Sequence, residues 1–124
     1  MELKKYFPYV SIDRPSKKFF IITNDNKKIY FGQSGYEHFT EGHLDERRKW
    51  SYISRHRRGE NWSDPNTAGF WSFHYLWLYP TYEQAMKRIN KIVKARLENK
   101  YSKILKAILH IIVSTTYNEF YEFF

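Results

Sequence analysis

Hydrophobic residues near the N-terminus come in two short runs separated by polar residues that favour turns. The runs are KKFFIIT (17–23) and KKIYFG (27–32), and Asn-Asp-Asn lies between them. β-Branched and aromatic residues on both sides of such a turn are typical of a β-hairpin. We therefore predict an antiparallel hairpin here. Residues 1–16 hold two prolines and show no clear period, and we expect them to form an extended arm.

The next segment has the composition and the period of a helix. From Leu44 to Arg58 helix-forming residues dominate without glycine or proline, and Gly59 is placed to end the helix. At about 100° per residue, Trp50 and Ile53 point to one side and most of the arginines to the other. We therefore expect Trp50 and Ile53 to face the core and an arginine stripe to face outward. The arginines within that arc are Arg47, Arg48, Arg55 and Arg58.

A second helix is expected from about residue 65 to residue 78. Asp64 followed by Pro65 has the form of an N-cap followed by proline at the first helical position. Apolar residues lie nearly all round this helix, which is typical of an element buried on several sides. We place FWSFHYLW (70–77) at the centre of the core and expect His74 to be a core histidine.

Two further apolar stripes follow Pro80. Thr81-Tyr82-Glu83-Gln84 matches a capping box and predicts a third helix, with a stripe from Tyr82 to Leu97. A second stripe runs from Tyr101 to Ile112, and it is offset from the first by about 100° if both belong to one helix. We therefore expect a break near Asn99, a fourth helix, and then an aromatic tail.

Together these elements predict an α+β fold, in which a small N-terminal antiparallel hairpin or sheet packs against three or four helices. The chain has 124 residues, which fits a single domain. We divide that domain into an extended arm (1–16), a core (17–98), and a C-terminal helix with the aromatic tail (99–124).

The amino-acid composition limits the kinds of partner and the kinds of active-site chemistry that the protein could have. Twenty-one Lys and Arg against thirteen Asp and Glu give a net charge of +8, which favours acidic partners. The absence of cysteine excludes disulfide scaffolds, thiolate nucleophiles and cysteine-based zinc sites. The longest apolar run, ILKAILHIIV (104–113), is shorter than the roughly 20 residues that span a bilayer, so we expect no transmembrane segment.

Three segments carry a resemblance to a known family. They are YFGQSGYEHFT (30–40), DERRKWSYISRHRRGENWSDPNTAGFWS (45–72) and LWLYPT (76–81). In this order they resemble an uncharacterised family of short basic proteins from large nucleocytoplasmic DNA viruses. The resemblance implies a giant-virus origin. It implies no activity, because that family has no established catalytic residues.

The densest basic cluster is the candidate binding surface, and Trp62 is the expected surface aromatic beside it. Three interpretations stay open for the cluster: contact with nucleic-acid phosphates, contact with an acidic protein, and a solvated helix face. We expect Trp71 and Trp77 to lie in the core, because they occur at helical spacing in an apolar segment. The candidate binding residues are Arg47, Arg48, Lys49, Arg55, Arg57, Arg58 and Trp62.

Catalytic motifs are missing from the sequence. No histidine spacing typical of a metal site occurs, and neither a glycine-rich phosphate loop nor a nucleophile elbow is present. His56 with Glu60, Asp64 and the Asp45-Glu46 pair is the one arrangement we considered for a metal-dependent nuclease. Because an acidic pair at a helix start is also expected from the helix dipole, we favour a protein without catalysis, metal or cofactor.

The hypothesis is therefore a non-enzymatic structural protein of a large DNA virus. It would be a minor capsid protein or an internal virion component that bridges other virion subunits through its basic helix and through ordered terminal segments. It would be located in the virion, and in the host cytoplasm during assembly. The alternative is a small basic nucleic-acid-binding protein that acts in viral genome packaging or expression.

Overall fold

A computed structural model gives the structure of the protein, describing the backbone of residues 6–122 and the side chains of residues 6–116. The chain forms two units, Met1–Asn90 and Lys91–Phe124. The single domain expected from the sequence stays a prediction.

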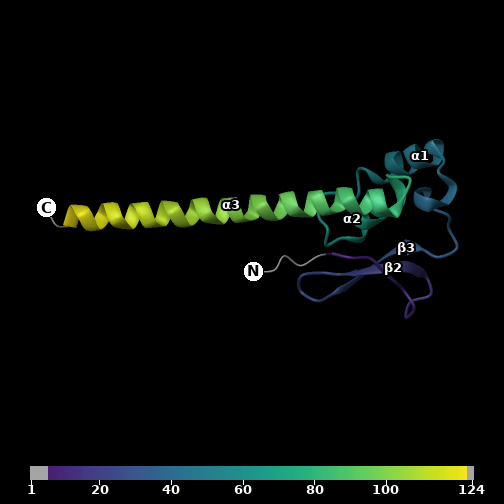
Figure 1. Ribbon diagram of the computed structural model, residues 1–124, viewed down its shortest axis with the longest axis horizontal. Helices are drawn as coiled ribbons and strands as arrows, with labels where there is room; N and C mark the ends of the chain where they lie inside the picture. Colours follow the sequence, from purple (N-terminus) through teal and green to yellow (C-terminus); the bar gives the residue numbers. More distant parts are fainter. Residues whose placement is uncertain (1–5, 123–124) are drawn as a thin grey trace. The chain divides into compact units, whose positions relative to one another are not determined.

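Unit 1 begins with a three-stranded antiparallel sheet in the order β1-β2-β3 (Figure 1). The strands are β1 (Tyr9–Val10), β2 (Lys17–Ile22) and β3 (Lys28–Gln33). The predicted hairpin is confirmed as β2 and β3, which pair from Lys17 opposite Gln33 to Ile22 opposite Lys28. β1 lies within the segment expected to be an extended arm, so part of that arm is an edge strand of the sheet.

The inner face of the sheet packs on helical aromatic rings. Phe19 of β2 and Phe31 of β3 are cross-strand partners, with their rings stacked at 5.6 Å. Both contact Tyr75 edge-on, and Phe31 also lies 5.9 Å from the ring of Trp71. Large aromatic rings bury much apolar area and lose little side-chain entropy on folding. This explains how so small a unit forms a core. The largest fully buried side chains are Trp71, Phe31, Phe70, Ile21, Leu76, Ile89 and Thr40.

Helical elements follow the sheet and complete the α+β fold that the sequence predicts. A wide turn, η1 (Phe39–His43), contains non-helical backbone angles and leads into α1 (Glu46–His56). α2 (Ala68–Trp71) continues directly as the wider η2 (Ser72–Trp77). The last element is α3 (Tyr82–Glu122). No helix among the described residues carries an apolar stretch long enough to cross a membrane.

The predicted start of the second helix is wrong. Its N-cap is Thr67, whose hydroxyl oxygen accepts a hydrogen bond from the Phe70 N–H at 3.2 Å. The Asp64 carboxylate instead accepts from the Asn66 N–H at 3.0 Å, and the Thr67 N–H donates to the Asp64 carbonyl. Asp-Pro-Asn suits a tight turn as well as a helix start, because proline fits the second position of a turn and Asp bonds its own backbone two residues on.

The predicted cap of α3 is confirmed, but the predicted break near Asn99 is wrong. The Gln84 N–H donates to the Thr81 hydroxyl oxygen at 3.1 Å, and the helix then continues without interruption from Tyr82 to Glu122. Helix hydrogen bonds need only backbone groups, and no glycine or proline interrupts them. The offset of the two stripes causes no strain, since Ala85 and Ile89 are fully buried whereas the later aliphatic side chains are exposed.

Three glycines provide a test of the close contact between β3 and η2. Gly32 has φ +77°, and a Cβ there would lie 3.0 Å from Leu76 Cδ1. Gly35 has φ +85° but open space around it, and Gly59 has neither restriction. We expect Gly32→Ala to lower the free energy of unfolding by about 2–4 kcal/mol, because left-handed strain and overpacking add. Gly35→Ala should cost about 1–2 kcal/mol. Gly59→Ala should change stability by less than about 0.5 kcal/mol.

Urea unfolding followed by tryptophan fluorescence measures all three variants. An equal loss in Gly32→Ala and Gly35→Ala would contradict the close packing of Gly32 against Leu76.

Candidate functional site

Local interactions stabilise helix α1 at both ends. The Asp45 carboxylate accepts hydrogen bonds from the N–H groups of Arg47 at 2.9 Å and Arg48 at 3.3 Å. Glu46 lies in the first turn, while Arg55 and His56 lie in the last, which complements the helix dipole at both ends. The helix expected between residues 44 and 58 is therefore confirmed, with slightly shorter bounds.

The inner face of α1 is fixed by Tyr52, which sequence reasoning missed. Its ring is 7% exposed and stacks on Trp77 of η2 at 4.6 Å with planes 6° apart. The other side of Tyr52 stacks on His56 at 4.3 Å. Burial raises the pKa of the Tyr52 hydroxyl, and the charge of Glu60 adds to the shift. Tyr52, Ile53 and His56 lie on one face of the helix, because positions i, i+1 and i+4 fall close together around a helix. This spacing could have identified the inner face from the sequence.

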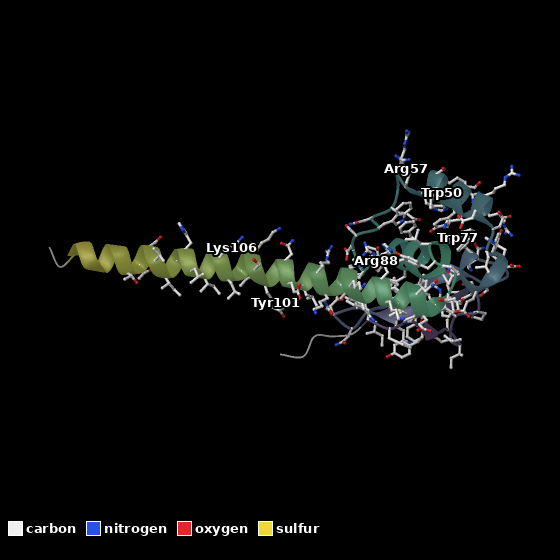
Figure 2. The ribbon with its side chains drawn as sticks, turned by 45° about the horizontal axis from the view of Figure 1, so that its top comes forward. Trp50, Arg57, Trp77, Arg88, Tyr101 and Lys106 are labelled. Atoms are coloured by element: carbon white, nitrogen blue, oxygen red, sulfur yellow. The ribbon has the colours of Figure 1, made fainter. Side chains whose placement is uncertain are left out.

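Trp50 therefore lies outside the core, which corrects the expectation that it points inward. Its side chain is 61% exposed. Figure 2 shows Trp50 and Arg57 on the α1 side of unit 1, away from the sheet. The rotation of α1 is set by the Tyr52–Trp77 stack, and this rotation moves Trp50 onto the outer face.

The arginines of α1 and of the turn that follows it are exposed, as the sequence predicts. Among the side chains of residues 6–116, none of their guanidinium groups has an acidic partner within 4.0 Å. They are Arg47, Arg48, Arg55, Arg57 and Arg58. We call these five residues together with Trp50 the arginine face. Its charge is uncompensated, so an anionic partner would meet guanidinium groups that have no competing carboxylate.

Lys49 differs from the arginines with which the sequence grouped it. Its ammonium group lies 3.0 Å from a Glu46 carboxylate oxygen, and its side chain is only 12% exposed. The same group lies 4.7 Å from the centre of the Phe39 ring. Lys49 is therefore neutralised within the fold and does not belong to the arginine face.

A shallow, open depression of about 730 Å³ runs along the arginine face. Two arginines, the exposed tryptophan and two hydroxyl groups meet there, which suits carboxylate or phosphate oxygens beside a flat apolar group. The Glu46 carboxylate also lines the depression, but it is paired with Lys49. The residues lining the depression are Glu46, Arg47, Trp50, Ser51, Ser54 and Arg55.

Trp62, predicted to be the surface aromatic, is half-buried. Its ring stacks on Phe73 at 3.9 Å with planes 6° apart, and its indole N–H donates to Glu60 Oε2 at 3.1 Å. Phe73 covers one face of the Trp62 indole, so at most the other face can meet a stacking ligand. Trp50, which is 61% exposed, is therefore more accessible for stacking than Trp62.

The acidic residues considered for a metal-dependent centre have structural partners. Glu60 contacts His56 Nδ1 at 3.0 Å as well as the Trp62 indole. Asp45 caps α1, and Asp64 accepts from the Asn66 backbone. Across the part of the chain that the structure describes, no group of three or more His, Asp or Glu side chains could hold a metal ion.

A smaller cleft of about 370 Å³ lies between β3, α1 and the α2–η2 helix. His38 lines it and is buried, with its Nδ1 2.9 Å from Lys18 Nζ. Burial lowers the pKa of His38 to about 4, and the charges of Lys18 and His43 act in the same direction. His38 is therefore neutral at physiological pH.

His74 lies in the core, as expected, but it is not the fully satisfied core histidine that the sequence suggested, because its Nδ1 has no hydrogen-bond partner among the described residues. It is 8% exposed, and its Nε2 lies 2.8 Å from the carbonyl oxygen of Trp62, to which it donates. Burial lowers the pKa of His74, partly opposed by that hydrogen bond.

Comparison with known proteins adds one match. A family described as a family of unknown function (DUF5754) matches residues 10–56, which is less than half of the chain. That range runs from β1 to the end of α1, so it includes Arg47, Arg48 and Arg55 but not Arg57 or Arg58. Neither the search of curated proteins nor that of solved structures found a match.

The buried histidine predicts a loss of stability in mild acid. The unfolded chain protonates His38 below a pH of about 6.5, whereas the folded chain resists protonation until about pH 4. The stabilisation from neutral His38 is therefore complete above pH 6.5 and is lost as the pH falls toward 4, by up to about 3 kcal/mol. Urea unfolding between pH 7 and 4 measures this loss. His38→Asn, which keeps an acceptor for Lys18, should show a smaller fall, and an unchanged fall would contradict the assignment to His38.

Tyr52 and Trp50 should contribute very differently to stability. We expect Tyr52→Ala to lower the free energy of unfolding by about 3 kcal/mol, because it removes the ring that stacks on Trp77. Trp50→Ala should change it by less than about 0.5 kcal/mol. Thermal unfolding followed by circular dichroism compares the two. A large loss in Trp50→Ala would place its ring in the core after all.

Proposed function

We propose that the protein is a non-enzymatic structural component of a large DNA virus, a minor capsid or internal virion protein that binds an acidic surface of another virion subunit through its arginine face. The observation that carries the proposal is the set of five exposed guanidinium groups without an acidic partner among the described residues. The viral context rests on the resemblance carried by residues 30–40, 45–72 and 76–81. Location in the virion, and in the host cytoplasm during assembly, belongs to the same proposal.

An acidic protein surface suits this face for two reasons. Guanidinium groups bind carboxylates in a bidentate geometry, which fixes orientation as well as affinity. Arginine and tryptophan are also the residue types that most often dominate the energy of protein interfaces. Trp50 lies beside Arg47 and Arg55 in one depression, so both residue types are present together.

The terminal segments are the second part of the bridging hypothesis. Residues 1–5 and 123–124 lie outside the described residues. The proposal therefore rests on α1 alone.

A nucleic-acid-binding protein is the second candidate function, and the exposure of Trp50 favours it specifically. An exposed indole next to guanidinium groups is also the combination on which unpaired bases stack while their phosphates are neutralised. This protein would act in viral genome packaging or expression.

A photoreactive amino acid in place of Trp50 distinguishes the two candidates in purified virus particles. We expect cross-links to another virion protein, while the same group at the exposed Asn90 of α3 should give few. Cross-links to nucleic acid would favour the second candidate. A chain missing from purified particles would rule out the virion proposal.

Charge variants test the same face in solution. Arg47→Gln/Arg55→Gln should weaken binding to the cross-linked partner by at least about tenfold, since two charge-assisted contacts are lost. Lys87→Gln/Arg88→Gln removes the same charge from α3 and serves as the matched control. Fluorescence anisotropy with a single-stranded oligonucleotide provides the comparison. Steeply salt-dependent binding whose slope falls only in the α1 variant would identify nucleic acid as the ligand.

A further inference from the structure

Unit 2 exposes a continuous series of aliphatic side chains on α3. Single exposed aliphatic residues are normal on protein surfaces, but a contiguous apolar patch marks an interaction site. The side chains are between 43% and 66% exposed, and they are Ile104, Leu105, Ile108, Leu109, Ile111, Ile112 and Val113.

Most of these side chains share one face of the helix. At about 100° per residue, all of them except Val113 fall within an arc of roughly 160°, with Ile108 and Ile112 near its centre. Lys100, Lys103 and Lys106 lie in a separate arc of roughly 120° that borders the apolar one. We call the segment 100–113 the amphipathic segment.

The charge of this part of α3 is almost entirely positive. From Lys91 to Val113 there are six Lys and Arg residues, and Glu98 is the one acidic residue. Glu98 lies 4.0 Å from Lys94, one turn before the amphipathic segment. Among the described residues, Lys100, Lys103 and Lys106 make no ion pair. The apolar face is therefore bordered by cations that need an anionic partner.

A second copy of the chain would cover the apolar face but would not neutralise these positive charges. Helices that pair along an apolar stripe usually place opposite charges beside it. In a parallel pair, the flanking lysines of one copy would meet the lysines of the other copy. An interface with anionic lipid headgroups satisfies both features at once, because apolar side chains enter the acyl region while lysines reach the headgroups.

We propose that the amphipathic segment of α3 binds the surface of a bilayer that contains anionic lipids, with the helix lying in the plane of the interface. At 1.5 Å per residue the segment is about 21 Å long, so it presents about four turns to the surface. Ile108 and Ile112 face the acyl chains, and Lys100 and Lys106, which flank the apolar arc, contact lipid phosphates or carboxylates. This surface belongs to unit 2 and does not depend on the ligand of the arginine face.

Sedimentation of the full chain with vesicles tests the apolar face. The chain should bind vesicles of phosphatidylcholine mixed with phosphatidylserine and should stay in solution with phosphatidylcholine alone. Ile108→Asp should lower partitioning by at least about tenfold, because it places a charge at the centre of the apolar arc. Val113→Asp makes a similar change outside that arc and should lower partitioning by less than about threefold. Equal losses in the two variants would overturn the proposal.

Two double variants with equal charge test the basic arc. Lys100→Gln/Lys106→Gln should lower partitioning into the mixed vesicles by about 25-fold, given roughly fivefold for each lysine near an anionic surface. Lys87→Gln/Arg88→Gln removes the same charge from exposed positions of α3 in unit 1, outside the arginine face, and should leave partitioning unchanged. A similar loss in both would mean that net charge alone attracts the chain, which would overturn the proposed site.

Misfolding and self-association are each examined by a control. All four tryptophans lie in unit 1, so an unchanged emission spectrum shows that each variant keeps the fold of that unit. Sedimentation equilibrium without lipid measures self-association. A dimer that Ile108→Asp dissociates, together with no binding to vesicles, would identify a second copy as the occupant and overturn the lipid proposal.

Discussion

The parallel stack of Tyr52 on Trp77 is the contact on which the arginine face depends. It joins α1 to η2 at 4.6 Å and sets the rotation of α1 about its own axis. Once Tyr52 faces inward, the arginines and Trp50 on the other sides of the helix must face outward. The same contact also explains why Lys49, one turn before Tyr52, is drawn toward Phe39 and neutralised by Glu46.

Contacts between aromatic rings also hold the other elements of unit 1 together. Phe19 and Phe31 of the sheet contact Tyr75 and Trp71, so the sheet and the α2–η2 helix are held by ring contacts in several directions. Two rings that titrate near neutral pH in water, His38 and His74, lie among them, and burial keeps both neutral. These two histidines therefore add no charge to the core at neutral pH.

Both proposed surfaces are positively charged, but they differ in residue composition. The arginine face combines guanidinium groups with one flat indole, which suits planar acceptors such as carboxylates. The amphipathic segment combines lysines with branched aliphatic side chains, which suits a soft apolar phase bordered by anions. Because they lie in different units, each can be removed by substitution without altering the other.

The sequence by itself determined the elements that depend on neighbours along the chain. The β2–β3 hairpin follows from two β-forming runs on either side of a turn, and the start of α3 follows from Thr81 as its N-cap. The burial of the α2–η2 helix follows from its high density of apolar residues. Each of these signals acts over a few residues. Tertiary structure alone decided which way each ring points. Trp50, expected in the core, is exposed because Tyr52 packs on Trp77 instead, and Trp62, expected at the surface, is half-buried because it stacks on Phe73. The tertiary structure also decided that α3 passes Asn99 unbroken, since the aliphatic side chains between residues 104 and 113 are exposed and need not share a buried face with Ala85 and Ile89. Helical periodicity defines the angles between side chains, but the rotation of a helix is fixed only by what it packs against.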